Sequence, residues 1–314
     1  MNTTLPAPRF HHLHLNSADP AAAIESYVAL FPTSARAWWG GRPALAAPND
    51  VLILFDEVSN PPTASPPSAI WHFGWHVPDS RKTLDSFQRR RELELLPLYT
   101  GDDGGSVFIS SDTWPGTGGV LGRTKTQIGE AKATGVQPTR AGGFAYLRGP
   151  DDALVEYAGN HPAERFNHVH FFHEDPFCAQ LWYTRHLNAA VPPGRTSPTP
   201  VTETSCPVPR GPDRTFPALD HEGMFRTPSA AVMFGDVAFP CYMRQGDRPL
   251  VSTRGQLYDH IALGVADLDA WIAKLRGEQV RFLEAPYPLG DTRAVMIEGP
   301  SLEAIELVQV RGLR

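Results

Sequence analysis

The stretch His168-Val-His-Phe-Phe-His-Glu-Asp175 places an aspartate seven residues after a histidine, where an apolar run meets a segment with helical periodicity. The same spacing occurs three more times, in His12-Leu-His-Leu-Asn-Ser-Ala-Asp19, His72-Phe-Gly-Trp-His-Val-Pro-Asp79 and His260-Ile-Ala-Leu-Gly-Val-Ala-Asp267. One match would carry little weight, but four indicate a structural unit that repeats along the chain. A histidine at the same place in every unit suggests metal binding.

Each repeat begins with an apolar run whose partial alternation predicts a half-buried strand. These strands are expected at Phe10–Ser17, Ile70–Val77, Phe166–Phe172 and Tyr258–Val265. The aspartate that follows suits a helix N-cap, because its carboxylate can accept unpaired backbone N–H groups. Helices are expected at Pro20–Leu30, Ser80–Arg91, Pro176–Leu187 and Leu268–Gly277. Shorter strand-like pieces come next, so the unit reads as strand, helix and about three strands, an α+β architecture.

Composition places the chain among soluble globular proteins. Its 314 residues are 41% hydrophobic and 20% charged, with a net charge of -6. No basic stripe is present, so we expect no nucleic-acid partner. No apolar run approaches the ~18 residues of a membrane span, so we expect no membrane association. Met1–Arg9 lacks the apolar core of a secretion signal.

Three cysteines, Cys178, Cys206 and Cys241, occur without CxxC spacing. We interpret them as buried or incidental thiols in a reducing compartment, which predicts a cytoplasmic location. Proline-rich or glycine-rich stretches at Asn60–Ser68, Gly101–Gly143 and Val191–Pro217 separate or interrupt the units. They are read either as linkers or as loops that cover a site.

Two units end in a shared pattern, Gly-Pro followed by a glutamate inside an apolar strand. In unit two Gly149 precedes Glu156 by seven residues, and in unit four Gly299 precedes Glu306 by seven. A carboxylate in a buried strand is costly unless it is paired or bound to a cation. Units one and three are expected to close with the strands 51–55 and 230–234, which carry no acid at their centres.

The histidines and glutamates divide evenly between two halves. The first half supplies His12, His72 and Glu156, and the second supplies His168, His260 and Glu306. This indicates a duplicated two-unit domain, predicted as 1–162 and 163–314. Two imidazoles and one carboxylate leave positions on a metal open, which suits non-heme Fe(II), with Mn(II) or Zn(II) as alternatives. The competing interpretations are core histidines with ordinary partners and glutamates that face solvent from an edge strand.

Further candidates lie beside the expected ligands. His14 and His170 are two residues beyond expected ligands, and His76 is four beyond His72, so period two puts them on the ligand face. They are candidate acid–base groups, or otherwise histidines that line the cleft. Tyr146 could donate to a metal-bound anion or could simply pack. His173 is expected on the opposite face. The motifs for nucleotide binding, serine hydrolysis and thiol redox chemistry are absent from the sequence.

The spacing His-x6-Asp in each first strand, with Gly-Pro-x5-Glu in two last strands, resembles the vicinal oxygen chelate superfamily. That superfamily includes glyoxalase I, bleomycin- and fosfomycin-resistance proteins, methylmalonyl-CoA epimerase and type I extradiol dioxygenases. The resemblance covers nearly the whole chain as four βαβββ modules in two tandem domains. It implies a metal inside a cleft of strands, with ligands from first and last strands.

Four units with a two-His-one-Glu set look most like type I extradiol dioxygenases. The extradiol signature Tyr-x-x-(Asp/Asn)-Pro-x-Gly is matched only partly by Tyr146-Leu-Arg-Gly149-Pro150, and unit four has no equivalent tyrosine. The resemblance also places a metal in the C-terminal half alone, whereas here both halves keep the set.

The leading hypothesis is a metal-dependent oxygenase that uses O2 on a small aromatic or enolizable substrate which chelates the metal. The first alternative is a glyoxalase- or epimerase-like isomerase or lyase that uses Zn, Ni, Co or Mn. The second is a non-catalytic binding protein of the antibiotic-resistance type. The partners expected are the small-molecule substrate and further copies of the chain in a homo-oligomer.

Overall fold

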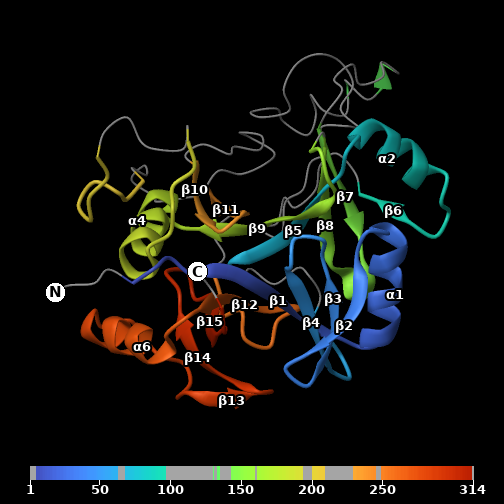
Figure 1. Cartoon of the computed structure of the whole chain (residues 1–314). Helices are drawn as coiled ribbons and strands as arrows, with labels where there is room; N and C mark the ends of the chain where they lie inside the picture. The colour runs from blue at the N-terminus through green and yellow to red at the C-terminus, as the bar shows by residue number, and fades with distance from the viewer. Residues whose placement is uncertain are drawn as a thin grey trace.

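The fold consists of two mixed β-sheets with helices packed around them (Figure 1). The computed structural model describes residues 5–62, 68–96, 130, 133–134, 143–159, 161–193, 200–208, 229–244 and 249–312. The eight-stranded sheet contains, in spatial order, β13 (Tyr287–Leu289), β14 (Thr292–Glu298), β15 (Ala304–Gln309), β12 (Tyr258–Val265), β1 (Arg9–Ser17), β4 (Leu52–Glu57), β3 (Arg42–Ala46) and β2 (Ala35–Trp39). The seven-stranded sheet contains β10 (Ser229–Phe234), β11 (Val237–Met243), β9 (Arg165–His173), β5 (Ile70–His76), β8 (Leu154–Ala158), β7 (Phe144–Arg148) and β6 (Glu94–Leu95).

The predicted α+β fold of βαβββ units is confirmed. The helices are α1 (Pro20–Leu30), α2 (Ser80–Gln88), α4 (Pro176–Leu187) and α6 (Leu268–Gly277), and a 3-10 turn η1 (Pro150–Asp152) precedes β8. Units one, two and four each have a strand, a helix and three strands. In the described part of unit three, the helix is followed by β10 and β11, with an isolated bridge between Ala190 and Met233.

The aspartates of the repeat cap three of the four helices. Asp19, Asp79 and Asp267 each accept a hydrogen bond from a backbone N–H in the first turn, at 2.9 Å. Asp175 was expected to do the same, and that prediction is wrong. Its carboxylate instead accepts from the backbone N–H of Val208 at 2.8 Å. It therefore fastens the segment 200–208 to the start of α4.

The first unit pairs with the last unit, and the two middle units pair with each other. In units one, two and four the first and last strands lie parallel, and two units join through antiparallel first strands. β1 pairs with β12 and β5 pairs with β9, so unit one joins unit four and unit two joins unit three (Figure 1). The division into domains 1–162 and 163–314 stays a prediction, and each sheet draws strands from both of those halves.

Every first strand carries a β-bulge, with one extra residue immediately before the histidine of the repeat. In β1 the register steps from Phe10 to His12 while β12 advances by one residue, which leaves His11 as the extra residue. The same shift adds Asp259 in β12, Trp71 in β5 and Asn167 in β9. A bulge interrupts the period of two. The residue two before each histidine therefore does not share its face.

One apolar core joins the two sheets and their helices. Phe10 of β1 stacks on Phe166 of β9 with ring centroids 5.4 Å apart, and the Tyr258 hydroxyl donates to the Leu154 carbonyl at 2.6 Å. Leu13 and Leu15 lie in this core. Because side chains alternate along a strand, His12 and His14 project from the opposite face of β1.

The cysteines differ from the sequence-based expectation. Cys178 and Cys206 form a disulfide that ties the segment 200–208 to α4, and Cys241 is a buried free thiol. The interpretation of all three as incidental thiols is therefore wrong for two of them, and the inference of a reducing compartment loses that support. No helix within the described ranges is long and apolar enough to cross a bilayer. Most of Gly101–Gly143 and of Val191–Pro217, read as linkers or covering loops, lies outside the described residues.

Candidate metal centres

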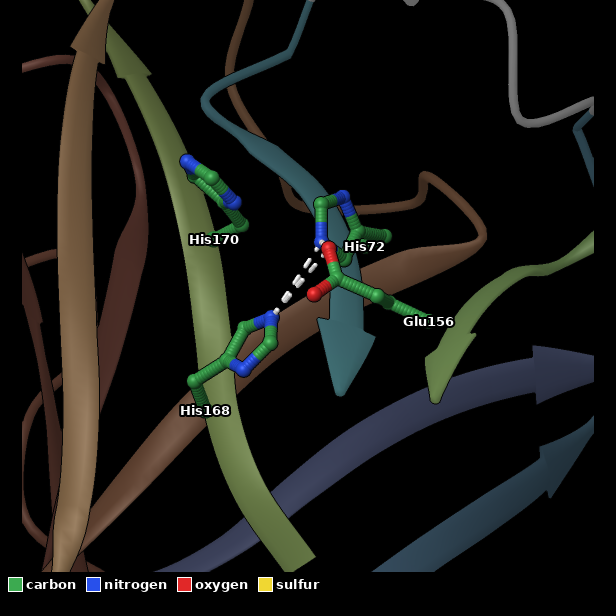
Figure 2. A group of neighbouring side chains, drawn as sticks. All are labelled: His72, Glu156, His168 and His170. Atoms are coloured by element: carbon green, nitrogen blue, oxygen red, sulfur yellow. Dashed lines mark hydrogen bonds and ion pairs between the residues drawn. The ribbon is translucent and has the colours of Figure 1, made fainter. Parts of the chain in front are cut away.

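Three strands bring four buried side chains together on the seven-stranded sheet (Figure 2). We call this group centre A, and its members are His72 on β5, Glu156 on β8, and His168 and His170 on β9. Nε2 of His72 lies 3.0 Å from Oε2 of Glu156 and 3.2 Å from Nε2 of His168. One potential ligand atom from each of the four residues falls within 4.8 Å of the others. This convergence of imidazoles and a carboxylate is what a transition-metal site requires.

The register of three strands around Gly74 assembles centre A. Gly74 pairs with Glu156 on one side and with His168 on the other, two residues after His72 in β5. A Cβ at this position would lie 2.5 Å from Nε2 of His168 and closer still to two other atoms of the ring. The glycine therefore gives the imidazole room to lie across the strand.

Aromatic side chains surround centre A. The ring of Tyr146 lies 5.1 Å from that of His72, and Tyr146 pairs with Glu156 in the β7–β8 register. The Tyr242 ring stands edge-on to His170 at 4.1 Å, and Trp71, the bulge residue of β5, lies 4.8 Å from His170. Burial lowers the pKa of His168 to about 4, so this imidazole is neutral and able to ligate at pH 7.

A second group occupies the equivalent place on the eight-stranded sheet. We call it centre B, and its members are His12 and His14 on β1, His260 on β12 and Glu306 on β15. Nε2 of His12 lies 3.3 Å from Oε2 of Glu306, and the rings of His14 and His260 stack at 4.4 Å. The β12–β15 register places Glu306 beside Ala262, which also pairs with His12. Ala262 thus stands where Gly74 stands in centre A.

Polar neighbours hold the side chains of centre B in place. Tyr287 donates a hydrogen bond from its hydroxyl to Oε1 of Glu306. Nδ1 of His260 lies 2.6 Å from Oδ1 of Asp259, whose carboxylate also binds the Arg254 guanidinium. These contacts leave Nε2 of His260 and Oε2 of Glu306 as the atoms available to a ligand.

A second set of contacts links His14 to the surface. Nε2 of His14 lies 3.1 Å from Asp56, and Arg42 donates to the same carboxylate at 2.7 Å. Hydrogen bonding to His14, followed by Arg42, holds the pKa of Asp56 well below its usual range. Asp56 therefore stays ionised and faces the buried imidazole with a negative charge.

The buried ligand atoms of centre B fit a divalent cation. Nε2 of His12 and Oε2 of Glu306 are both buried, and neither makes a hydrogen bond to the described residues. Burial holds the pKa of His12 well below its usual value, lowers that of His260 to about 4 and raises that of Glu306 to about 7. A buried carboxylate with one oxygen lacking a hydrogen bond, beside neutral imidazoles, is costly, and a cation between them would offset that cost.

The structure corrects how the predicted ligands are grouped. The sequence grouped His12 with His72 and Glu156, and His168 with His260 and Glu306. In the structure His12 shares a centre with His260 and Glu306, while His168 shares one with His72 and Glu156. Each centre is built from two first strands and one last strand, taken from both halves of the chain.

The remaining candidates divide between the centres and their surroundings. His14 and His170 belong to the two centres, and Tyr146 lies against centre A. His76 lies outside the ligand clusters among the described residues and stacks on His161 at 4.7 Å. His173 lies 2.5 Å through Nδ1 from the Ser301 hydroxyl, on the core side, as expected.

Sequence reasoning missed Asp259, Asn167, Tyr242 and Tyr287. For Asp259 and Asn167 the sequence offered one faint signal, which is that each immediately precedes a repeat histidine.

Each centre includes one glutamate from a last strand, and Asp56 of β4 lies beside centre B, 3.1 Å from Nε2 of His14. In unit one, Leu54 pairs with His14 at the position that corresponds to the glutamates. The prediction that unit three closes with the strand 230–234 is wrong, because β11 is the strand parallel to β9. Pro240 occupies the corresponding position there, one residue before Cys241, which pairs with Phe171. Neither Leu54 nor Pro240 can ligate through its side chain, so each centre offers the two histidines and one glutamate of the prediction together with a third histidine, His14 or His170.

Known structures share this architecture across the whole chain. Glyoxalase I from Zea mays superposes with a TM-score of 0.60 and 12% identity, covering 96% of this chain and 92% of that one. A candidate dioxygenase from Bacillus subtilis subsp. subtilis str. 168 gives a TM-score of 0.58 and 8% identity, covering 98% and 86%. The chain has the vicinal oxygen chelate fold. No protein-family model and no curated protein sequence matches the chain.

Within this fold, a sheet formed from two βαβββ units carries residues of both units on one of its faces. This chain has two such sheets, and the described residues place one centre on each. The likeness extends to one enzyme named as a glyoxalase and one named as a dioxygenase. Their identities to this chain are low, so the reaction has to be argued from the two centres themselves.

Proposed function

We propose that the protein is a metal-dependent oxygenase in which each centre holds a non-heme Fe(II) ion, with Mn(II) or Zn(II) as the alternative ions. The observation that carries this proposal is the ligand set: each centre has three imidazoles from first strands and one carboxylate from a last strand, with Leu54 or Pro240 where a second carboxylate would stand. We assign two of the imidazoles and the carboxylate as ligands. Two histidines and one carboxylate with open positions are the ligand set of non-heme Fe(II) oxygenases.

In centre A, His72, His168 and Glu156 would hold the ion, and in centre B, His12, His260 and Glu306 would do so. A bound divalent ion supplies a Lewis acid and a template for a substrate that offers two adjacent oxygens. The aromatic rings of Trp71, Tyr146 and Tyr242 surround centre A. They favour a small aromatic or enolizable substrate, because such rings stack on planar ligands and exclude water.

The additional histidine of each centre is the proposed proton acceptor. His14 lies on the same strand face as His12, and His170 lies on the same face as His168. His14 is buried and contacts Asp56, which is half-exposed. Because Nε2 of His14 donates to this ionised carboxylate, a further proton would be taken by Nδ1. The carboxylate would stabilise the imidazolium that results and could receive the Nε2 proton on its way to solvent. Tyr146, whose ring lies 5.1 Å from that of His72, would orient an anionic substrate oxygen.

Metal analysis and oxygen consumption together test the proposal. Protein purified without chelator is expected to contain up to two iron or manganese ions per chain by mass spectrometry, and to consume O2 with catechol-type substrates. His72→Ala and His260→Ala should each remove one ion. His161→Ala, which changes a histidine outside both centres, should remove none.

Two other outcomes would replace the proposal. Metal-dependent turnover of substrates without O2 uptake would favour the isomerase or lyase that the likeness to glyoxalase I suggests. A protein with no affinity for any added divalent ion would indicate a binding protein without metal chemistry.

A further inference from the structure

The residue that each bulge adds lies against the histidine that follows it. Oδ1 of Asp259 lies 2.6 Å from Nδ1 of His260, and Nδ2 of Asn167 lies 2.9 Å from Nδ1 of His168. Nδ1 of His11 lies 2.9 Å from Nδ1 of His12. In the fourth strand the Trp71 ring stands edge-on to His72 at 4.4 Å.

This placement follows from the bulge itself. In a regular strand, consecutive side chains point to opposite faces and do not meet. A bulge puts two residues opposite one and turns the extra side chain. In these four strands the extra side chain contacts the next ring, and in three of them a polar atom reaches Nδ1. The partner of Nδ1 decides which nitrogen carries the proton, so it decides whether Nε2 offers a lone pair to a cation.

The bulge residues of the two centres differ in charge and hydrogen bonding. Two groups face Nδ1 of His260: the Asp259 carboxylate at 2.6 Å, which can only accept, and Nη1 of Arg254 at 3.3 Å, which can only donate. The shorter contact with Asp259 places the proton of His260 on Nδ1. The backbone N–H of Gly255 also donates to Asp259 at 2.6 Å, and the Arg254 guanidinium binds it as well, so the carboxylate is fixed. It also places a negative charge one hydrogen bond from the proposed ligand, and the paired Arg254 guanidinium offsets part of that charge.

At centre A the corresponding contact is made by a neutral amide. The amide nitrogen of Asn167 faces Nδ1 of His168, an orientation in which the amide donates and Nδ1 accepts. Ligation through Nε2 requires the proton on Nδ1. The amide must then rotate so that its oxygen accepts. An aspartate at position 167 would need no such rotation and would bring a charge.

We propose that Asp259 and Asn167 are positioning residues that set the metal affinities of the two centres, so that centre B binds its ion more tightly than centre A. This inference rests on the proposed metal binding and goes beyond it, because it makes the two centres unequal. It assigns the inequality to residues that are not themselves ligands. Outer hydrogen-bond partners of ligating histidines typically change metal affinity by about 10–100-fold.

The test uses proteins that retain one centre each. A centre-B protein carries His72→Ala and His168→Ala, and a centre-A protein carries His12→Ala and His260→Ala. Zn(II) affinity is measured by competition with a chromophoric chelator, with circular dichroism as the check of folding. We expect the centre-B protein to bind Zn(II) about tenfold or more tightly than the centre-A protein.

The bulge substitutions are then added to each background. Asp259→Asn, which keeps an acceptor of similar shape, should weaken Zn(II) binding by the centre-B protein about 10-fold or more. Asn167→Asp should strengthen binding by the centre-A protein. Asp269→Asn removes an equal charge from an exposed residue of α6 that binds Arg293, and it should change neither affinity.

A second readout needs neither metal nor activity. In apo protein labelled with 15N-histidine, the ring nitrogen shifts should show His260 protonated on Nδ1, and this preference should weaken in Asp259→Leu. Equal affinities of the two centres, or Asp259→Asn and Asn167→Asp variants within twofold of their parents, would overturn the inference while leaving metal binding intact. If neither background binds any metal, the proposed function fails. The nitrogen shifts alone then decide whether Asp259 positions the ring.

Discussion

The substitution Gly74→Ala is expected to empty centre A of its metal while leaving centre B and the fold unchanged. An alanine Cβ would lie 2.5 Å from Nε2 of His168, whereas ordinary contacts begin near 3.4 Å. The nitrogen proposed as the ligand must therefore move by ~0.9 Å or more. Metal–nitrogen bonds tolerate only about ±0.2 Å around their usual length, so the bond is lost. The affinity of centre A should fall at least ~100-fold, which corresponds to ~2.8 kcal/mol.

The assay is the metal content of protein dialysed against a fixed concentration of free Zn(II), which should fall from two ions per chain to one. Ala262→Gly is the matched control, because Ala262 holds the corresponding place beside His12 and Glu306. It should keep both ions. Thermal melting of the metal-free proteins checks that the strand is intact. Two ions bound by Gly74→Ala with unchanged affinities would refute the argument that this glycine makes room for His168.

Four further predictions concern stability. Burial raises the pKa of Glu303 to about 7 from about 4.5, so the folded protein favours the protonated acid. Its stabilising contribution is complete below pH 4.5 and is lost as the pH rises to 7, a change of about 3 kcal/mol. Glu303→Gln should flatten the melting temperature between pH 5 and 8, and an unaltered slope would contradict this. Cys178→Ser opens a disulfide between residues 28 apart and should lower the free energy of unfolding, measured with denaturant, by ~3–4 kcal/mol. Cys206→Ser should have the same effect. Asp267→Ala should lower the free energy of unfolding by ~1 kcal/mol, because it removes the side-chain cap of α6. Asp175→Ala should lower the melting temperature only when the disulfide is open, because Asp175 fastens the segment 200–208 and does not cap α4 with its side chain. An equal loss with the disulfide closed and open would contradict this role.

Local structure was predictable because it depends on local chemistry. The limits of α1, α4 and α6 agree with the sequence-based ranges, since aspartate caps and Pro20 or Pro176 mark where those helices begin. α2 ends three residues earlier than expected, at Gln88 rather than Arg91. The residues expected to continue the helix, Arg89–Arg91, are all charged, so they provide no apolar side chain to hold a further turn against the core.

The composition of the centres was predictable and their pairing was not. All six expected ligands lie in the two clusters, because a histidine or glutamate buried at a repeated position requires a partner that compensates the loss of water. Which strands meet depends on contacts between residues far apart in sequence, such as His14 with His260. The even division of the histidines and glutamates between the two halves of the chain suggested that units pair within each half. The sheet register shows that β1 instead pairs with β12.

The bulges were also invisible in the sequence. Apolar residues in the first strands alternate only in part, as in β1, where two histidines separate Phe10 from Leu13. That irregularity marks the extra residue once the register is known. Without a partner strand, however, an interrupted alternation is indistinguishable from a weak strand signal.

The pairing of unit one with unit four has a consequence for synthesis on the ribosome. β1 emerges first, yet its antiparallel neighbour β12 begins at Tyr258, so centre B cannot form until most of the chain has been made. Units two and three are consecutive and can complete their sheet while unit four is still being translated. The nascent chain must keep the unpaired edge of β1 from aggregating during that interval. A pause or truncation late in translation would therefore leave a protein with a finished centre A and an exposed N-terminal strand.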